Sequence, residues 1–278
     1  MPMRNGSYYV SLLHDFKGRR VMCEFCGTET ASESDLCICS GCECLASSSR
    51  EGLEAKDHEL LGALDSIRKS TESKDFAAAA AAYDALTVSR KVVQLDYAAA
   101  VAYIRASNSE LTEINYMKEG FMEDNPKHRV KSEKLMLSAK NLLARAIATA
   151  ESEMAKGEAS TGSMYGRFLS MLKMDMGRGA SQAAKELEKS GNRFVSGYAN
   201  MLLLSHKGDY RNLLASAEEF TRKGNFSTNA FYYVAYALFR LGKAKDAKAV
   251  MEALKGLMSN VNSEALLFEI DASLSIWK

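Results

Sequence analysis

Apolar residues recur at helical spacing along most of the chain after residue 53. Between Leu53 and about Ser70 they fall at Leu60, Leu61, Leu64 and Ile67, on one face of a 3.6-residue period. Asn125-Pro126 predicts a helix start, because an N-cap residue precedes proline at the first helical position. No alternating strand pattern follows residue 50, and the chain has only two prolines. The pattern therefore predicts an all-α region over residues 53–278.

The first 45 residues have a different pattern. Gly18, Gly27 and Gly41 suit tight turns, and the segment RRVMCEFC predicts a short strand. A Ser/Gly-rich stretch, ASSSREG, follows at residues 46–52. We therefore expect three parts: a small module over 1–45, a linker over 46–52 and a helical domain over 53–278.

Two segments near the C-terminus match each other. KGDYRNLLASAEEF and LGKAKDAKAVMEAL align through Gly208 and Gly242, 34 residues apart, with apolar residues at matching offsets. This match resembles the tetratricopeptide repeat (TPR), a helix-turn-helix unit of that period. The better copy is Thr228–Val261. The copy at Phe194–Ser227 is weaker, because Gly197 stands where a large aromatic residue is expected.

The resemblance covers about a quarter of the chain. It implies an array of helical hairpins, an α-solenoid, in which each pair buries its apolar face against its neighbours. No 34-residue period is visible between residues 90 and 190. A generic helical bundle with alanine-rich helices remains the alternative fold.

All six cysteines lie between residues 23 and 44. The N-terminus lacks the apolar region of a signal peptide, so clustered thiols favour metal ligands over disulfides. Cys23 and Cys26 form one CxxC pair, Cys39 and Cys42 another, with twelve residues between them. Two such pairs supply the four tetrahedral ligands of Zn²⁺. Together they resemble a zinc ribbon, and we expect one zinc ion bound by these four residues.

Three alternatives to that ligand set remain open. Cys37 or Cys44 can replace a neighbour in the set. Iron can replace zinc, since the twelve-residue gap is also similar to the rubredoxin-like site of rubrerythrins. The Glu-x-x-His motifs of the di-iron bundle in those proteins are absent from this sequence. The six cysteines can also be free, reduced thiols.

Composition and motifs argue against several classes of function. The net charge is +1, without the basic excess that attracts nucleic acid. The sequence has no GxxxxGK phosphate loop and no HExxH motif, so we expect no enzymatic activity. No apolar run approaches the roughly 18 residues that span a bilayer. We expect a cytoplasmic protein that does not enter membranes.

These observations favour an interaction scaffold or adaptor for a protein or peptide partner. By the TPR resemblance, its concave face would be lined by Tyr198, Asn229, Tyr232, Tyr236 and Phe239. Aromatic residues dominate binding hot spots, which suits peptide recognition. The same rings can instead fill the core, and the sequence does not decide between the two.

Two further expectations concern the ends of the chain. In the alternative function the ribbon contacts RNA or DNA through Lys17, Arg19, Arg20 and Phe25 while the helices dock to a larger complex, although the charge balance disfavours it.

The predicted last helix, Asn262–Trp277, carries two apolar stripes, one including Leu266 and the other including Phe268. The second stripe would meet a twin chain, a partner protein, or an earlier helix folded back.

Overall fold

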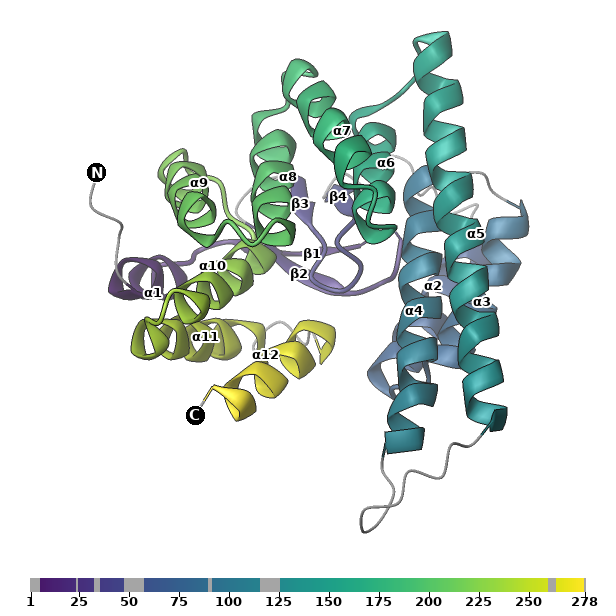
Figure 1. The fold of residues 1–278 in the computed structure, drawn as a ribbon, viewed down its shortest axis with the longest axis horizontal. Coiled ribbons are helices and arrows are strands. Elements are labelled where there is room, and N and C mark those ends of the chain that lie inside the picture. Colours follow the sequence, from purple (N-terminus) through teal and green to yellow (C-terminus); the bar gives the residue numbers. More distant parts are fainter. Residues whose placement is uncertain are drawn as a thin grey trace. The chain divides into compact units, whose positions relative to one another are not determined.

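The computed structural model describes residues 6–23, 25–32, 36–47, 58–89, 92–115, 126–259 and 264–277. Over these residues the chain forms twelve helices and four short strands (Figure 1). The prediction of a mainly helical chain with a small strand-containing N-terminal region is confirmed. None of the helices described is both long enough and apolar enough to cross a bilayer.

The helices are α1 (Gly6–His14), α2 (His58–Glu72), α3 (Phe76–Ser89), α4 (Val93–Asn115), α5 (Pro126–Lys156), α6 (Thr161–Lys173), α7 (Gly177–Lys189), α8 (Arg193–His206), α9 (Tyr210–Arg222), α10 (Thr228–Arg240), α11 (Ala244–Ser259) and α12 (Glu264–Ile276). Pro126 begins α5 as expected, but the predicted cap, Asn125, lies outside the described residues. So do residues 48–52 of the predicted linker and residues 262–263 of the predicted last helix.

Contacts along the chain divide it into two compact units. The first comprises Met1–Glu24, Thr28–Gly52 and Gly177–Lys278, and the second comprises Phe25–Gly27 and Leu53–Met176. The first unit therefore contains α1, the four strands and α7–α12, whereas the second contains α2–α6. The independent folding of residues 1–45 stays a prediction.

The strands form two antiparallel hairpins in the first unit. β1 (Arg19–Met22) pairs with β2 (Glu29–Ser32), with Arg19 opposite Ser32. β3 (Leu36–Ile38) pairs with β4 (Leu45–Ser47), with Leu36 opposite Ser47. β1 coincides with the strand predicted from RRVMCEFC. Each hairpin holds one CxxC pair in its turn.

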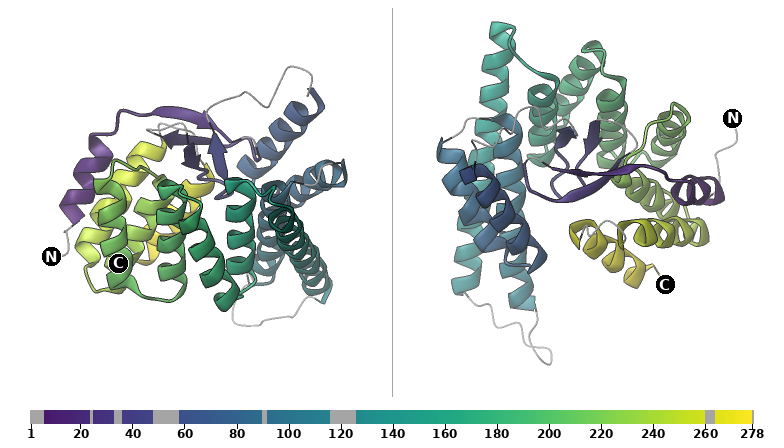
Figure 2. Two further views of the ribbon diagram at one scale, coloured as in Figure 1. Left: turned by 90° about the horizontal axis from the view of Figure 1, so that it is seen from above. Right: turned by 180° about the vertical axis from the view of Figure 1, so that it is seen from behind.

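The helices of the first unit pack one on the next from α7 to α12 (Figures 1 and 2). α8 also contacts α10, and α1 packs on α11 and α10. Asn192, Asp209 and Ser227 cap α8, α9 and α10, since each side chain accepts a hydrogen bond from the backbone N–H three residues on. These caps fix where each helix begins.

Left-handed residues end successive helices at regular intervals. The residues with positive φ after α5 to α10 are Gly157, Asp175, Gly191, Gly208, Gly224 and Gly242. Taken alternately they form two series, 157–191–224 and 175–208–242, whose members lie 33 or 34 residues apart. This conformation terminates helices and favours glycine. The spacing seen between Gly208 and Gly242 thus extends back to residue 157, into a segment where the sequence shows no repeat.

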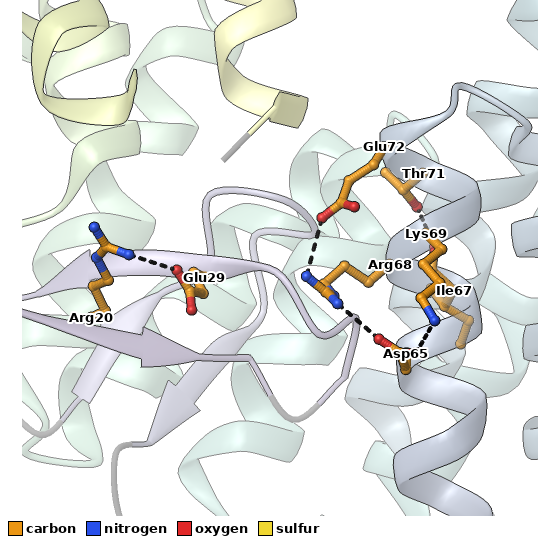
Figure 3. Close-up of polar contacts among 8 residues, drawn as sticks. All are labelled: Arg20, Glu29, Asp65, Ile67, Arg68, Lys69, Thr71 and Glu72. Carbon is orange, nitrogen blue, oxygen red and sulfur yellow. Dashed lines mark hydrogen bonds and ion pairs between the residues drawn. The ribbon is translucent and has the colours of Figure 1, made fainter. Parts of the chain in front are cut away.

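In the second unit, α4 packs on both α5 and α3, and α5 also packs on α6. Asp96 on α4 is 1% exposed and accepts two hydrogen bonds, of 2.7 and 2.6 Å, from Arg145 on α5. On α2, Asp65 pairs with Arg68 at 2.8 Å and with Lys69 at 2.6 Å (Figure 3). The buried pair joins two long helices, whereas the pairs on α2 lie on its surface.

Candidate metal centre

Each CxxC pair lies in a turn that a backbone hydrogen bond closes. The N–H of Cys23, just after β1, donates to the carbonyl of Thr28 at 3.0 Å. The N–H of Cys39, just after β3, donates to the carbonyl of Cys44 at 2.9 Å. We call these turns the first and second knuckles, residues 23–28 and 39–44. Both hairpins therefore end in a loop whose cysteine side chains are held in place.

The two knuckles bring four sulfurs together. The Sγ atoms of Cys23, Cys26, Cys39 and Cys42 all lie within 4.8 Å of one another, and all four residues are buried. The Sγ atoms of Cys23 and Cys42 are 3.7 Å apart. Four thiolates around a tetrahedral ion, with metal–sulfur bonds of about 2.3 Å, have edges of about 3.8 Å. The cluster therefore has the size and donor set to hold a metal ion such as zinc.

Cys37 and Cys44 lie outside this cluster, although they are only 1% and 0% exposed. Burial, and then the neighbouring Cys39, raises the pKa of the Cys37 thiol to about 12. The sulfurs of Cys37 and Cys44 are thus not among the four that could share one metal ion. None of the six cysteines, all among the described residues, forms a disulfide.

Hydrogen bonds hold the second knuckle against β2. The N–H of Gly41 donates to Sγ of Cys39 at 3.3 Å, which stabilises negative charge on the sulfur. The N–H of Ser40 donates to Oγ1 of Thr30 at 2.9 Å. Thr30 and Ser40 are both buried. The second CxxC pair is thus positioned by the first hairpin as well as by its own.

The residue after the second cysteine of each pair is left-handed. Gly27 has φ +68° and Glu43 has φ +61°. Glycine adopts this conformation without strain, but glutamate does not. The Glu43 carboxylate accepts a 2.8 Å hydrogen bond from the hydroxyl of Tyr233 on α10. One turn earlier on α10, the amide of Asn229 donates to the carbonyl of Cys39 at 3.2 Å.

The second knuckle is therefore docked on α10 within the first unit. Asn229 is 4% exposed, so this contact is buried. The repeat resemblance pointed to Asn229 for a different reason, and it did not point to Tyr233 or Glu43. The available signal in the sequence was that Glu43 follows the second CxxC pair at the position where Gly27 follows the first.

All five residues predicted to bind a partner make contacts inside the fold. Tyr198 is 0% exposed, and Asn229 bonds to the second knuckle. Tyr232 shares a 3.3 Å hydrogen bond with Ser273 of α12, and Tyr236 lies edge-on to Tyr210. Phe239 stacks on Trp277, with 4.7 Å between ring centroids. Their role toward a partner stays a prediction.

One of the two apolar stripes on α12 is buried. Leu266, Ile270 and Trp277 are at most 7% exposed, whereas Ile276 on the other stripe is 74% exposed. The side chain of Phe268 lies outside the described residues. Self-association through this helix stays a prediction.

The residues of the alternative nucleic-acid function are partly engaged elsewhere. Arg20 on β1 pairs with Glu29 on β2 at 3.5 Å (Figure 3). Phe25 is 9% exposed, and its carbonyl accepts a 2.7 Å hydrogen bond from the Tyr83 hydroxyl in the second unit. The buried Phe25 ring is a poor stacking platform for a base, whereas the Arg20 side chain remains 56% exposed. Contact of this hairpin with nucleic acid stays a prediction.

Four buried cysteine ligands would complete the coordination of a tetrahedral ion. Such closed sites stabilise folds, whereas catalytic zinc sites keep one position open for water or substrate. A closed set of four thiolates suits a zinc ion or an iron ion. Comparison with protein-family models, with curated proteins and with solved structures finds no match, so this conclusion depends on the geometry of the site.

Proposed function

We propose that the protein is a non-enzymatic interaction scaffold, a TPR-like helical array whose N-terminal knuckles bind one structural zinc ion. The observation that carries the proposal is the buried group of Cys23, Cys26, Cys39 and Cys42, with sulfurs within 4.8 Å of one another. Its second knuckle is docked on α10 of the array through Asn229. The metal would thus stabilise helices as well as the small hairpins.

Two features support a TPR-like array. Left-handed residues recur every 33 or 34 residues after alternate helices, as a helix-turn-helix repeat requires. Neighbouring helices from α7 to α12 pack together in order. Arrays of this kind present extended surfaces to partner proteins. An interaction role follows from this architecture.

Zinc is the proposed metal because the site is closed. A tetrahedral set of four thiolates suits zinc or iron. Redox work by iron would need an electron-transfer partner, and the sequence lacks the di-iron motifs that accompany such sites in rubrerythrins. Structural zinc supplies folding free energy and no redox chemistry.

Metal analysis of cysteine variants tests the site. We expect about one zinc per chain in the wild type. Cys26→Ser should abolish the zinc, whereas Cys37→Ser, which changes an equally buried cysteine, should retain it. Equal loss in both variants would refute the assigned ligand set.

Reconstitution tests the interaction role. Proteins that co-purify with the tagged chain are purified and mixed with the untagged chain, and complexes are measured by light scattering. A defined stoichiometric complex supports the scaffold function. Failure of every candidate to bind directly, or turnover of a substrate by the chain alone, would refute it.

A further inference from the structure

A groove is lined by residues at α7, α8 and α9 in the first unit. Among these three helices, α8 lies between the other two (Figure 1). The volume of the groove is about 750 Å³, within the range of roughly 300–1,000 Å³ typical of ligand sites.

Small residues make the groove. Gly197 stands at the position where the repeat would carry a large aromatic side chain. A Cβ atom added there would lie 3.1 Å from the ring of Phe220, so a large side chain would occupy the space now open. Ala184, Ser196 and Ser216 continue the shallow lining. The buried Leu203 and Phe220 give it an apolar floor.

The rim of the groove is basic. It carries four cationic side chains, those of Lys185, Arg193, Lys207 and Lys223. It carries only two carboxylates, those of Glu188 and Glu219. Lys223 is bonded to Glu219 at 2.6 Å, which lowers the pKa of that carboxyl. Lys185, Arg193 and Lys207 are exposed and make no ion pair with any residue that the structure describes. A net positive charge is thus left for a ligand.

The positions of these charges indicate the shape of the ligand. Arg193 begins α8 and Lys207 follows its last residue. At 1.5 Å per residue their backbones lie about 21 Å apart along the helix. About six residues of extended chain cover that length. Between the two ends, Asn200 and Ser216, themselves joined by a 3.1 Å hydrogen bond, offer donors and acceptors to a peptide backbone.

We propose that this groove binds an extended acidic segment of a partner protein, with carboxylates near Arg193 and Lys207 and backbone groups over Asn200. The inference rests on the proposed interaction function and names the chemistry of its partner. Glu219 is paired with Lys223, but the exposed carboxylate of Glu188 would repel a continuous phosphate backbone, so a peptide with spaced acidic residues fits better than nucleic acid.

Fluorescence anisotropy tests the proposal on the full-length protein. The probe is a labelled hexapeptide pool with glutamate at the first and last positions and Ala, Ser, Leu or Tyr between them. A second pool carries glutamine in place of glutamate, and an eight-nucleotide uridine strand serves as the nucleic-acid probe. The test variant is Lys185→Glu/Lys207→Glu. The matched control is Lys248→Glu/Lys245→Glu, on exposed positions of α11 in the same unit.

We expect the glutamate pool to bind the wild type about tenfold tighter than the glutamine pool, and more weakly at high salt. The test variant should lose about tenfold in affinity while the control and the circular dichroism spectra stay unchanged. Equal binding of the two pools, unchanged binding by the test variant, or tighter binding of the uridine strand would overturn the proposal. A reconstituted partner that binds the test variant normally would refute the groove and leave the scaffold function intact.

Discussion

Replacing Asn229 by alanine removes the amide that α10 extends to the second knuckle. The amide is 4% exposed and lies 3.2 Å from the carbonyl of Cys39, a residue that is 0% exposed. Taking a donor from a buried acceptor costs about 1–3 kcal/mol. We therefore expect Asn229→Ala to lower the free energy of unfolding by about 2 kcal/mol. For a chain of this size the melting temperature would fall by roughly 4–8 °C.

Urea denaturation followed by circular dichroism measures this loss, first with metal bound and then after chelation. The control is Asn200→Ala on α8, an exposed asparagine whose loss should change the free energy of unfolding by less than about 0.5 kcal/mol. Metal-free knuckles should be largely unfolded, because the metal supplies their folding free energy. The effect of Asn229→Ala should then nearly vanish in the chelated protein.

The reasoning fails in either of two ways. An equal destabilisation with and without metal would show that Asn229 acts inside α10 and not through the knuckle. A loss below about 0.5 kcal/mol in the metal-bound protein would show that the docking contact contributes nothing measurable.

Three further variants test other contacts. Tyr233→Phe should lower the free energy of unfolding by about 1 kcal/mol, because it removes the hydroxyl that donates to Glu43. Adding Glu43→Gly should restore about 1 kcal/mol of that free energy, because glycine adopts positive φ without strain. If the double variant is instead less stable than Tyr233→Phe in urea denaturation, Glu43 is not strained. Phe239→Ala should shift the emission of Trp277, the one tryptophan of the chain, to the red, and an unchanged spectrum would show that their stacking does not hold α12. Arg145→Met should lower the free energy of unfolding by about 3 kcal/mol, since it leaves a buried carboxylate without its cation; a loss under 1 kcal/mol in the same assay would contradict this.

The cysteine cluster could be predicted because its determinants are local. Two residues between the cysteines of each pair, and twelve between the pairs, allow two short hairpins to bring four sulfurs together. The sequence could not rank Cys37 and Cys44, since both are near neighbours of true cluster members. Their exclusion depends on distances between sulfur atoms, which are known only once the two hairpins are folded.

The 34-residue spacing was recognised only at Gly208 and Gly242, where the flanking apolar residues also match. Gly157, Gly191 and Gly224 follow a spacing of 33 or 34 residues without such a match, and Asp175 takes the left-handed conformation without being a glycine. In the repeat pattern Gly197 is a departure from the expected large aromatic residue. In the structure the missing side chain is what opens the groove over α8.

The surroundings of the α10 side chains could not be predicted from that helix. Its spacing of aromatic residues is the same whether a ring faces a partner or packs under another part of the chain. Asn229 donates to the carbonyl of Cys39, and Tyr233 donates to the carboxylate of Glu43. Each partner lies 190 positions earlier in the sequence. Long-range docking of this kind leaves no local pattern.

X-ray absorption spectroscopy of the purified protein tests the central claim most directly, because it identifies the metal, its ligands and its bond lengths together. The proposed site predicts a zinc edge and four sulfur neighbours at about 2.3 Å. An iron edge, nitrogen or oxygen in the first coordination shell, or a protein that binds no metal with all six thiols free would contradict it.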